Sequence, residues 1–360
     1  MTLYATKSLG LSVSDAGLLI TFYGLGSLLG TYAGGWLSIR WGTYKVQLYS
    51  LILSGFGFIL LGEFHEFRDV AIAMFLLAMV SDAFRPANAS AIGTACPPQL
   101  KARCFGLNRL AINLGMTIGP AVGGFLAAVD YRLLFWADGI TCLAAAIVLA
   151  IVLKPEKTVF KAENTRASGG FFSPLKDRVF LILLVLLFSM GLVFSQMFST
   201  WPLFLGEIYL FKEEQIGLFM ALNTLLIVLF EMPLIRTLES KNQVFIMAIG
   251  ALFLFVGFSI LPISSMMGFV IFTVVLWTVG EMLVFPIAGG LIANRSSDEE
   301  MSKYMGLFTF TFSLAIVFGP FLGTRIYVHL GPNFVWYFTG IIGLFAMAGF
   351  YHLHLRVSKS

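Results

Sequence analysis

The chain has 360 residues, of which 58% are hydrophobic and only 12% are charged, and its formal net charge is +4. Soluble domains carry roughly 45–50% apolar and about 25% charged residues, so this composition excludes an ordinary soluble domain. A mean hydropathy of +0.90 predicts instead a protein whose surface faces lipid. The small positive charge gives no reason to expect a nucleic-acid partner.

Long apolar runs predict α-helices that cross a membrane, because each span needs ~20 apolar residues and its backbone groups must bond internally. We predict eleven such helices, at residues 15–38, 44–62, 70–95, 103–128, 132–153, 178–201, 214–236, 243–262, 267–293, 303–328 and 332–354. The polar stretch 154–177 predicts a linker between an N-terminal bundle, residues 1–153, and a C-terminal bundle, residues 178–360. The expected fold is an all-α polytopic membrane protein.

The two bundles repeat each other at an offset of 200 residues, as when Gly119-Pro120 recurs as Gly319-Pro320. Such a repeat is typical of a transporter built from two parallel halves. Helix 178–201 is the one predicted helix without a partner, and its counterpart would lie just before Met1. We therefore expect an architecture of twelve helices of which this sequence holds eleven. A protein that naturally has eleven is the alternative.

The orientation in the membrane is predicted from the positive residues. Sixteen of the 23 Lys and Arg residues lie in loops or near helix ends expected on one side and five on the other, while Arg85 and Arg109 lie further inside predicted helices. The linker and the carboxyl terminus are therefore expected in the cytoplasm. The short loops are typical of a protein of a bacterial inner membrane.

Neither a metal site nor an enzyme is indicated. Cys96, Cys104 and Cys142 lack the spacing of metal ligands, and the predicted cytoplasmic position of the first two argues against a disulfide. The four histidines lie in loops or at helix ends, so no Ser-His-Asp arrangement is indicated. The Gly-rich stretches lie inside apolar helices and form no phosphate loop. We expect no metal, no cofactor and no enzymatic activity.

Helix 103–128 carries a spaced set of small residues. Gly106 is followed after eight residues by Gly115, then by Gly119-Pro120 and Gly123-Gly124. Glycines let another helix approach closely, and Pro120 removes a backbone donor and bends the helix. The spacing resembles the antiporter motif of the drug–proton exchangers in the major facilitator superfamily. Simple bundle packing is the alternative interpretation.

Twelve helices in two bundles with a central linker also resemble that superfamily. The resemblance implies its two-bundle fold and transport by alternating access. A weaker resemblance, to the superfamily's cytoplasmic signature loop, is carried by Gly35, Arg40, Gly42 and Lys45. Ile39 stands where the family has an aspartate that helps to latch the cytoplasmic side, so Arg40 needs another partner or stays solvated.

Ionisable side chains at bilayer depth usually face a cavity or a partner. Asp82 and Arg85 are three residues apart on one helix face and can pair. Glu281, in the repeat-related helix, lies one position from the counterpart of Asp82, and a carboxylate withdrawn from water can take up a proton near neutrality. We expect these groups to bind substrate or couple protons, or else to form a static ion pair.

Three further charges have weaker indications. Glu231, beside Pro233, and Asp138 are candidates for the same roles, or they reach the membrane surface or contact a neighbouring helix. Arg109, six residues into its helix, is expected to reach the cytoplasmic surface or to pair with an acidic group.

The expected function is proton-coupled efflux of a small amphipathic compound by a monomer in the lipid bilayer. One alternative is a proton-coupled importer of a small polar or anionic solute, which Arg85 and Arg109 favour. Another is a membrane sensor or truncated relic that transports nothing. The missing first helix and Ile39 favour that alternative.

Overall fold

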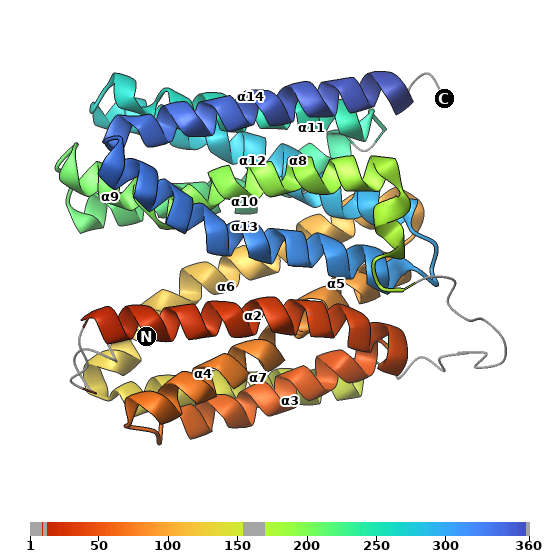
Figure 1. Cartoon of the computed structure of the whole chain (residues 1–360), viewed down its shortest axis with the longest axis vertical. Helices are drawn as coiled ribbons and strands as arrows, with labels where there is room; N and C mark the ends of the chain where they lie inside the picture. Colours follow the sequence, from red (N-terminus) through yellow and green to blue (C-terminus); the bar gives the residue numbers. More distant parts are fainter. Residues whose placement is uncertain (1–8, 10–12, 154–169, 239, 358–360) are drawn as a thin grey trace. The chain divides into compact units, whose positions relative to one another are not determined.

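The computed structural model describes residue 9 and residues 13–153, 170–238 and 240–357. Within these residues the chain is α-helical with short 3-10 turns and has no strand, so the all-α prediction is confirmed (Figure 1). The helices are α2 (Val13–Trp41), α3 (Thr43–Leu61), α4 (Phe67–Asp82), α5 (Phe84–Ala95), α6 (Lys101–Val129), α7 (Tyr131–Val152), α8 (Arg178–Phe194), α9 (Thr200–Glu207), α10 (Glu213–Leu238), α11 (Gln243–Ser259), α12 (Met267–Arg295), α13 (Met301–His329) and α14 (Pro332–Val357). Across the described ranges, nine segments are long and apolar enough to cross a membrane.

Two predicted helices are interrupted. The predicted helix 70–95 is divided into α4 and α5 at Ala83, because Pro86 has no N–H to donate to the carbonyl of Asp82. The predicted helix 178–201 ends as α8 at Phe194 and continues through a 3-10 turn, Ser195–Phe198, into α9.

The Gln196 side chain supports this second interruption. Its amide donates to the carbonyls of Leu192 and Gly319, at 2.9 Å each, and its carbonyl accepts from Thr200. A side chain that bonds the backbone competes with the helical ladder. No glycine or proline within the turn itself signals the break.

The chain forms two compact units. Unit 1 comprises residues 1–94, 118–173 and 296–313, and unit 2 comprises residues 95–117, 174–295 and 314–360. Helices α6 and α13 each contribute to both. The bundle boundaries expected from sequence stay a prediction, and linker residues 154–169 lie outside the described residues.

Unit 1 has its core where α2 packs on α4 and where α3 packs on α4 and α7 (Figure 1). The buried side chains at its centre are all apolar: Leu19, Leu61, Val70, Ala71, Met74, Leu77 and Phe135. Gly139 of α7 allows the close approach to α3, since a Cβ there would lie 2.6 Å from Ile59.

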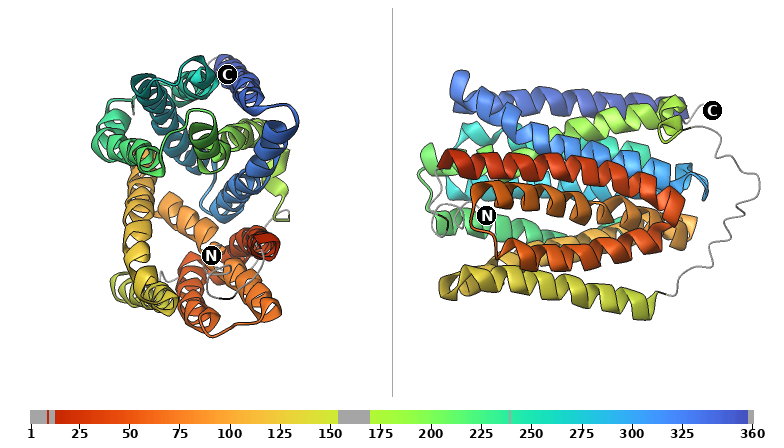
Figure 2. Two further views of the ribbon diagram at one scale, coloured as in Figure 1. Left: turned by 90° about the vertical axis from the view of Figure 1, so that its left-hand side faces the viewer. Right: turned by 60° about the horizontal axis from the view of Figure 1, so that its bottom comes forward.

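Unit 2 is held by an aromatic core between α11, α12 and α14. Phe258 stacks on Trp277 with ring centroids 5.4 Å apart and on Trp336 at 6.1 Å, and all three are fully buried. The left view of Figure 2 looks nearly along the helix axes and shows the helices of each unit end-on as a bundle. This apolar packing surrounds the few buried polar side chains on α10 and α12.

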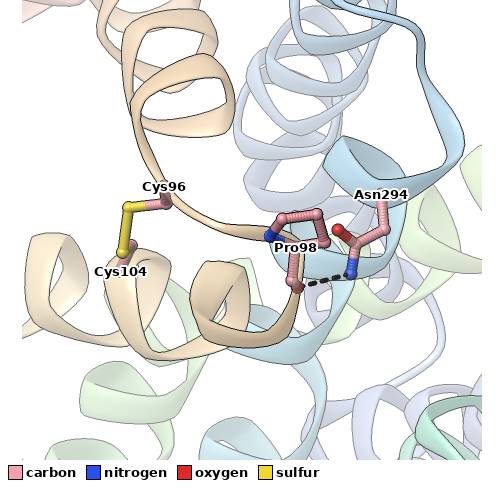
Figure 3. The surroundings of a disulfide bond; sticks show 4 residues. All are labelled: Cys96, Pro98, Cys104 and Asn294. Carbon is pink, nitrogen blue, oxygen red and sulfur yellow. Dashed lines mark hydrogen bonds between the residues drawn. A yellow bond between two sulfur atoms is a disulfide. The ribbon is translucent and has the colours of Figure 1, made fainter.

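The turn between α5 and α6 is closed by a disulfide between Cys96 and Cys104 (Figure 3). The expectation from sequence that no disulfide forms here is wrong for this structure. The expectation rested on the cellular compartment, whereas the short turn brings the two Cα atoms to 6.7 Å, within bridging reach. The turn also docks on the end of α12, because Asn294 donates to the carbonyl of Pro98 at 3.0 Å and Lys101 to that of Ala293 at 2.8 Å.

The disulfide predicts a specific alkylation pattern. In unfolded, unreduced protein a maleimide should modify Cys142 alone, because Cys96 and Cys104 are joined. After a dithiol reductant all three cysteines should be modified, as intact mass would show. Modification of three cysteines without reductant would contradict the pairing.

The N-terminus of α8 is capped by Asp177, which also pairs with Arg295 at the end of α12. Partial burial raises the pKa of Asp177, but hydrogen bonds from Arg295 and from the N–H groups of Phe180 and Val179 outweigh it and leave the pKa below its usual 3.8. A lowered folded-state pKa contributes stability at neutral pH that is lost as the pH falls below the unfolded value.

We therefore expect thermal stability to fall below about pH 4 more steeply in the native protein than in Asp177→Asn. Asparagine keeps the cap but loses the ion pair, so at pH 7 the variant should be less stable by about 0.5–1 kcal/mol. Differential scanning calorimetry checks both. If the melting temperatures of the two proteins depended on pH in the same way, the ion pair between Asp177 and Arg295 would not contribute to stability.

Candidate functional site

Arg109 of α6 joins two buried carboxylates in unit 2. Its Nη1 donates to Oε2 of Glu231 on α10 at 2.7 Å, and its Nη2 donates to Oε1 of Glu281 on α12. Nη1 also lies 3.2 Å from the backbone carbonyl of Glu281. The Arg109 side chain is 14% exposed, and those of Glu231 and Glu281 are 0% and 3% exposed.

Two polar neighbours complete this cluster. Asn223 of α10 donates from Nδ2 to Oε2 of Glu281 at 2.9 Å and to Thr278 at 3.0 Å. Thr278 in turn donates to the carbonyl of Val274, one turn earlier in α12. We call Arg109, Asn223, Glu231, Thr278 and Glu281 the charge cluster.

Local packing places Arg109 inside unit 2. One turn before it lies Gly106, where a Cβ would lie 2.6 Å from Ile235 and 3.7 Å from Oε1 of Glu231. Residues three apart share a helix face. The missing side chain at Gly106 therefore lets α6 approach α10, and Arg109 follows on the same face into the interior.

The environment of Arg109 differs in part from the one predicted from the sequence. Its predicted pairing with an acidic group is confirmed, but it does not reach the surface, and its partners are the two candidate carboxylates. Glu231 likewise does not reach the membrane surface, because it is fully buried against Arg109. Asn223 and Thr278 were not singled out at all. Two buried carboxylates without a cation are themselves a signal that a buried arginine is required.

The charges of the cluster do not balance. One guanidinium and two carboxylates sum to 1 − 2 = −1 when all are ionised. A net charge inside apolar helices is costly, and one bound proton removes it. The cluster is therefore suited to take up and release one proton.

The repeat offers an internal comparison for the cluster. At an offset of 200 residues, Glu231 corresponds to Thr31, Glu281 to Ser81 and Arg109 to Thr309, all in unit 1. There the Thr31 hydroxyl hydrogen-bonds that of Ser313 at 3.1 Å. Neutral hydroxyl groups thus suffice to pack the equivalent helices, and packing alone does not explain the charges in unit 2.

The predicted pair of Asp82 and Arg85 is present in unit 1, with Nε 2.8 Å from Oδ1. The Asp82 side chain is 6% exposed, whereas that of Arg85 is 58% exposed. Asp82 Oδ2 has no hydrogen-bond partner among the described residues. The Arg85 side chain is thus exposed within the membrane-spanning segment Phe67–Ala95.

Asp138 lies apart from the other candidates, on an exposed part of α7, and no ion pair to it is found within the described ranges. Its own neighbour Thr141 donates to backbone carbonyls of the preceding turn. The structure does not bring Asp138 into the charge cluster.

The glycines of the antiporter-like motif differ in their surroundings. Gly106 packs closely against α10, as predicted. A Cβ at Gly115 or Gly119 would meet no described atom within 4 Å, and at Gly123 it would meet Leu134 at 3.3 Å. The helix face is exposed at Gly115 and Gly119 within the described residues, so a close approach of another helix there stays a prediction. Pro120 and Gly124 lie in α6, but their side-chain surroundings fall outside the described part.

The close crossing of α6 and α12 predicts a strong effect at another glycine. A Cβ at Gly290 would lie 2.7 Å from the backbone nitrogen of Ala102. Gly290→Ala should lower the melting temperature, with a loss of about 1–3 kcal/mol. The matched control Gly115→Ala should be neutral or stabilising by up to about 1 kcal/mol. Equal melting temperatures for the two variants would contradict the crossing.

The signature-loop residues have structural roles in unit 1. Gly42 separates α2 from α3 with φ +82°, a value that favours glycine. A Cβ at Gly35 would lie 3.0 Å from the Cα of Gly306. Arg40 finds its partner in Trp36, whose ring centroid is 4.0 Å from the guanidinium carbon, and Lys45 is exposed.

No group of three or more His, Cys, Asp or Glu residues able to hold a metal ion occurs in the described ranges. A groove of about 500 Å³ lies between α3 and α4, lined by apolar side chains and Asp69. It contains none of the predicted site residues. The charge cluster is thus the principal candidate site.

The family model described as Major Facilitator Superfamily matches residues 1–307 and 245–359. The "Uncharacterized MFS-type transporter YqjV" of Bacillus subtilis (strain 168) is 23% identical over 334 residues, covering 90% of this chain and 80% of the relative. The "Quinolone resistance protein NorA" of Staphylococcus aureus is 26% identical over 198 residues, covering 54% of this chain and 51% of the relative. That match therefore spans about half of each protein.

Two solved structures share the fold. The human organic anion transporter MFSD10 (TETRAN) aligns with a TM-score of 0.78 at 16% identity, covering 97% of this chain and 88% of its own. The proton:xylose symporter XylE, bound to 6-bromo-6-deoxy-D-glucose, aligns with a TM-score of 0.73 at 14% identity, covering 98% and 90%.

Proposed function

Because the chain belongs to the Major Facilitator Superfamily of membrane transporters, we propose that it couples the movement of a small amphipathic compound out of the cell to proton entry. The observation that best supports this proposal is the charge cluster, in which Arg109 binds two carboxylates from α10 and α12. The name of the relative NorA supports a drug-like substrate, and that of XylE supports proton coupling within the same fold.

The proposed mechanism uses alternating access. In one state the cluster holds a proton and is neutral. In the other state the proton has left, and the cluster carries a charge of −1 that a cationic or dipolar substrate stabilises. Because the two states differ in charge, they differ in their preferred surroundings, and a pH gradient can bias the equilibrium between them.

A second candidate is proton-coupled transport of a small organic anion. Arg85 favours it, because its side chain is exposed within a membrane-spanning segment and only Nε is bonded to Asp82 in the contacts described for unit 1. A planar guanidinium suits a carboxylate. The neighbour MFSD10 is itself described as an organic anion transporter.

Transport in proteoliposomes separates these candidates. A fluorescent quinolone and an aromatic carboxylate would serve as probes, with a pH gradient imposed across the membrane and a dye reporting internal pH. If the protein couples efflux to proton entry, the quinolone should move in the direction opposite to the protons. If it transports organic anions, the aromatic carboxylate should move instead. Probe transport that is indifferent to the gradient and moves no protons would contradict the proposal.

A further inference from the structure

The two carboxylates of the charge cluster differ in their hydrogen bonding. Both oxygens of Glu281 are occupied, Oε1 by Arg109 and Oε2 by Asn223. Glu231 has one bond, from Arg109 to Oε2, and its buried Oε1 has no hydrogen-bond partner among the described residues. Hydrogen bonds to a carboxylate favour its ionised form, so the two groups are not equivalent.

From this asymmetry we infer that Glu231 carries the exchangeable proton, while Asn223 is a positioning residue that keeps Glu281 ionised as the permanent counter-ion of Arg109. The inference rests on the proposed function and names its proton-carrying atom, Oε1 of Glu231. The charged groups that face Glu231 are Arg109 on α6 and Glu281 on α12.

The opposite assignment is less favourable in the same geometry. A proton on Glu281 would leave donors from Arg109 and Asn223 directed at a neutral acid. The ionised Glu231 would then keep one buried oxygen without a donor, and an unsatisfied buried charge is more costly than an unsatisfied neutral group. With the proton on Glu231, the remaining charges form a balanced pair of Arg109 and Glu281, in which both carboxylate oxygens of Glu281 keep a donor.

Gly106 contributes to this arrangement. A Cβ at Gly106 would lie 3.7 Å from Oε1 of Glu231 and 2.6 Å from Ile235, so the missing side chain is what allows these groups to pack against α6. Gly106 is the first glycine of the antiporter-like motif. The motif thus meets the charge cluster at the atom to which the proton is assigned.

Simple neutralisation cannot test the assignment. Glu231→Gln leaves Arg109 balanced by Glu281, and Glu281→Gln leaves it balanced by Glu231, so either variant loses the need for a proton. Two interacting acids titrate as a pair. A readout that distinguishes the two side chains is needed.

Infrared difference spectroscopy on the full chain in lipid vesicles provides that readout. A protonated carboxylic acid has a carbonyl stretch that a carboxylate lacks, and its frequency differs between aspartic and glutamic acid. We expect wild type to show one such band on acidification. Glu231→Asp should move the band, and Glu281→Asp should leave it in place.

The outcomes distinguish a failure of the proton assignment to Glu231 from a failure of the proposed function. A band that moves in Glu281→Asp, or in neither variant, overturns the assignment but leaves proton coupling intact. A wild-type protein without any titrating carboxylic band overturns the proposed function as well.

Asn223 is tested in the same spectra. Asn223→Ala should give the band a second component that moves when Glu281→Asp is added, because Glu281 has lost a donor. Thr273→Val is the matched control, because the Thr273 hydroxyl is also buried on α12 but donates to the carbonyl of Val270 in its own helix, and it should leave the band unchanged. An Asn223→Ala band identical to that of wild type would contradict the positioning role.

Discussion

Replacing Arg109 with methionine should be among the most disruptive single changes in this protein. It leaves Glu231 and Glu281 buried without their cation, and removing one partner of a buried ion pair costs about 3–5 kcal/mol. The carboxylates of the variant must bind protons to stay buried. Its stability should therefore decrease as the pH rises from 5 to 8, and thermal unfolding in detergent or lipid would show this.

A triple variant provides the control for Arg109→Met. Combining it with Glu231→Gln and Glu281→Gln removes every formal charge of the cluster, and most of the lost stability should return. The basis is unit 1, where Thr31, Ser81 and Thr309 occupy the equivalent positions without charge. Gradient-driven transport should remain absent. An Arg109→Met protein as stable as wild type at pH 8 would contradict the geometry.

Glu231→Gln should separate transport from proton coupling. Glutamine resembles the protonated acid and leaves the Arg109–Glu281 pair balanced, so folding should be close to that of wild type. Gradient-driven accumulation of the probe should fall about tenfold or more, which corresponds to ~1.4 kcal/mol of lost coupling. Exchange of labelled for unlabelled probe across the membrane without a gradient should persist. Both assays use the same proteoliposomes.

The prediction for Glu231→Gln has a matched control on the same helix and an outcome that would contradict it. Glu214→Gln, at the start of α10, changes an exposed acid on the same helix and should leave both assays unchanged. If Glu231→Gln accumulated its probe as wild type does, with the same dependence on pH, the cluster would not couple protons.

Much of the fold followed from the sequence, because apolar runs and the 200-residue repeat are direct consequences of the bilayer and of internal duplication. The same rule that buried charges are costly identified Glu231, Glu281 and the Asp82–Arg85 pair. Neither the interruption at Gln196 nor the disulfide was predicted. The interruption depends on contacts of the Gln196 side chain that no local pattern records, whereas the disulfide was rejected because its turn was expected in the cytoplasm.

Arg109 shows why the site was only partly predictable. Counted from the start of its helix, it lies close enough to the end to reach the surface. Its true environment depends on Gly106 packing against α10, a contact between segments more than a hundred residues apart. Asn223 was overlooked because one amide in an apolar helix has no distinctive spacing. Charge balance between distant helices would have been the better guide.

Proton exchange by the charge cluster is tested most directly by counting the protons that the cluster binds. Wild type and the variant with Arg109→Met, Glu231→Gln and Glu281→Gln would be titrated side by side in lipid vesicles, from about pH 8 to pH 5. We expect wild type to take up about one more proton per molecule than the variant, since one proton neutralises the cluster. Identical titrations would contradict it, because the three side chains would then hold no exchangeable proton.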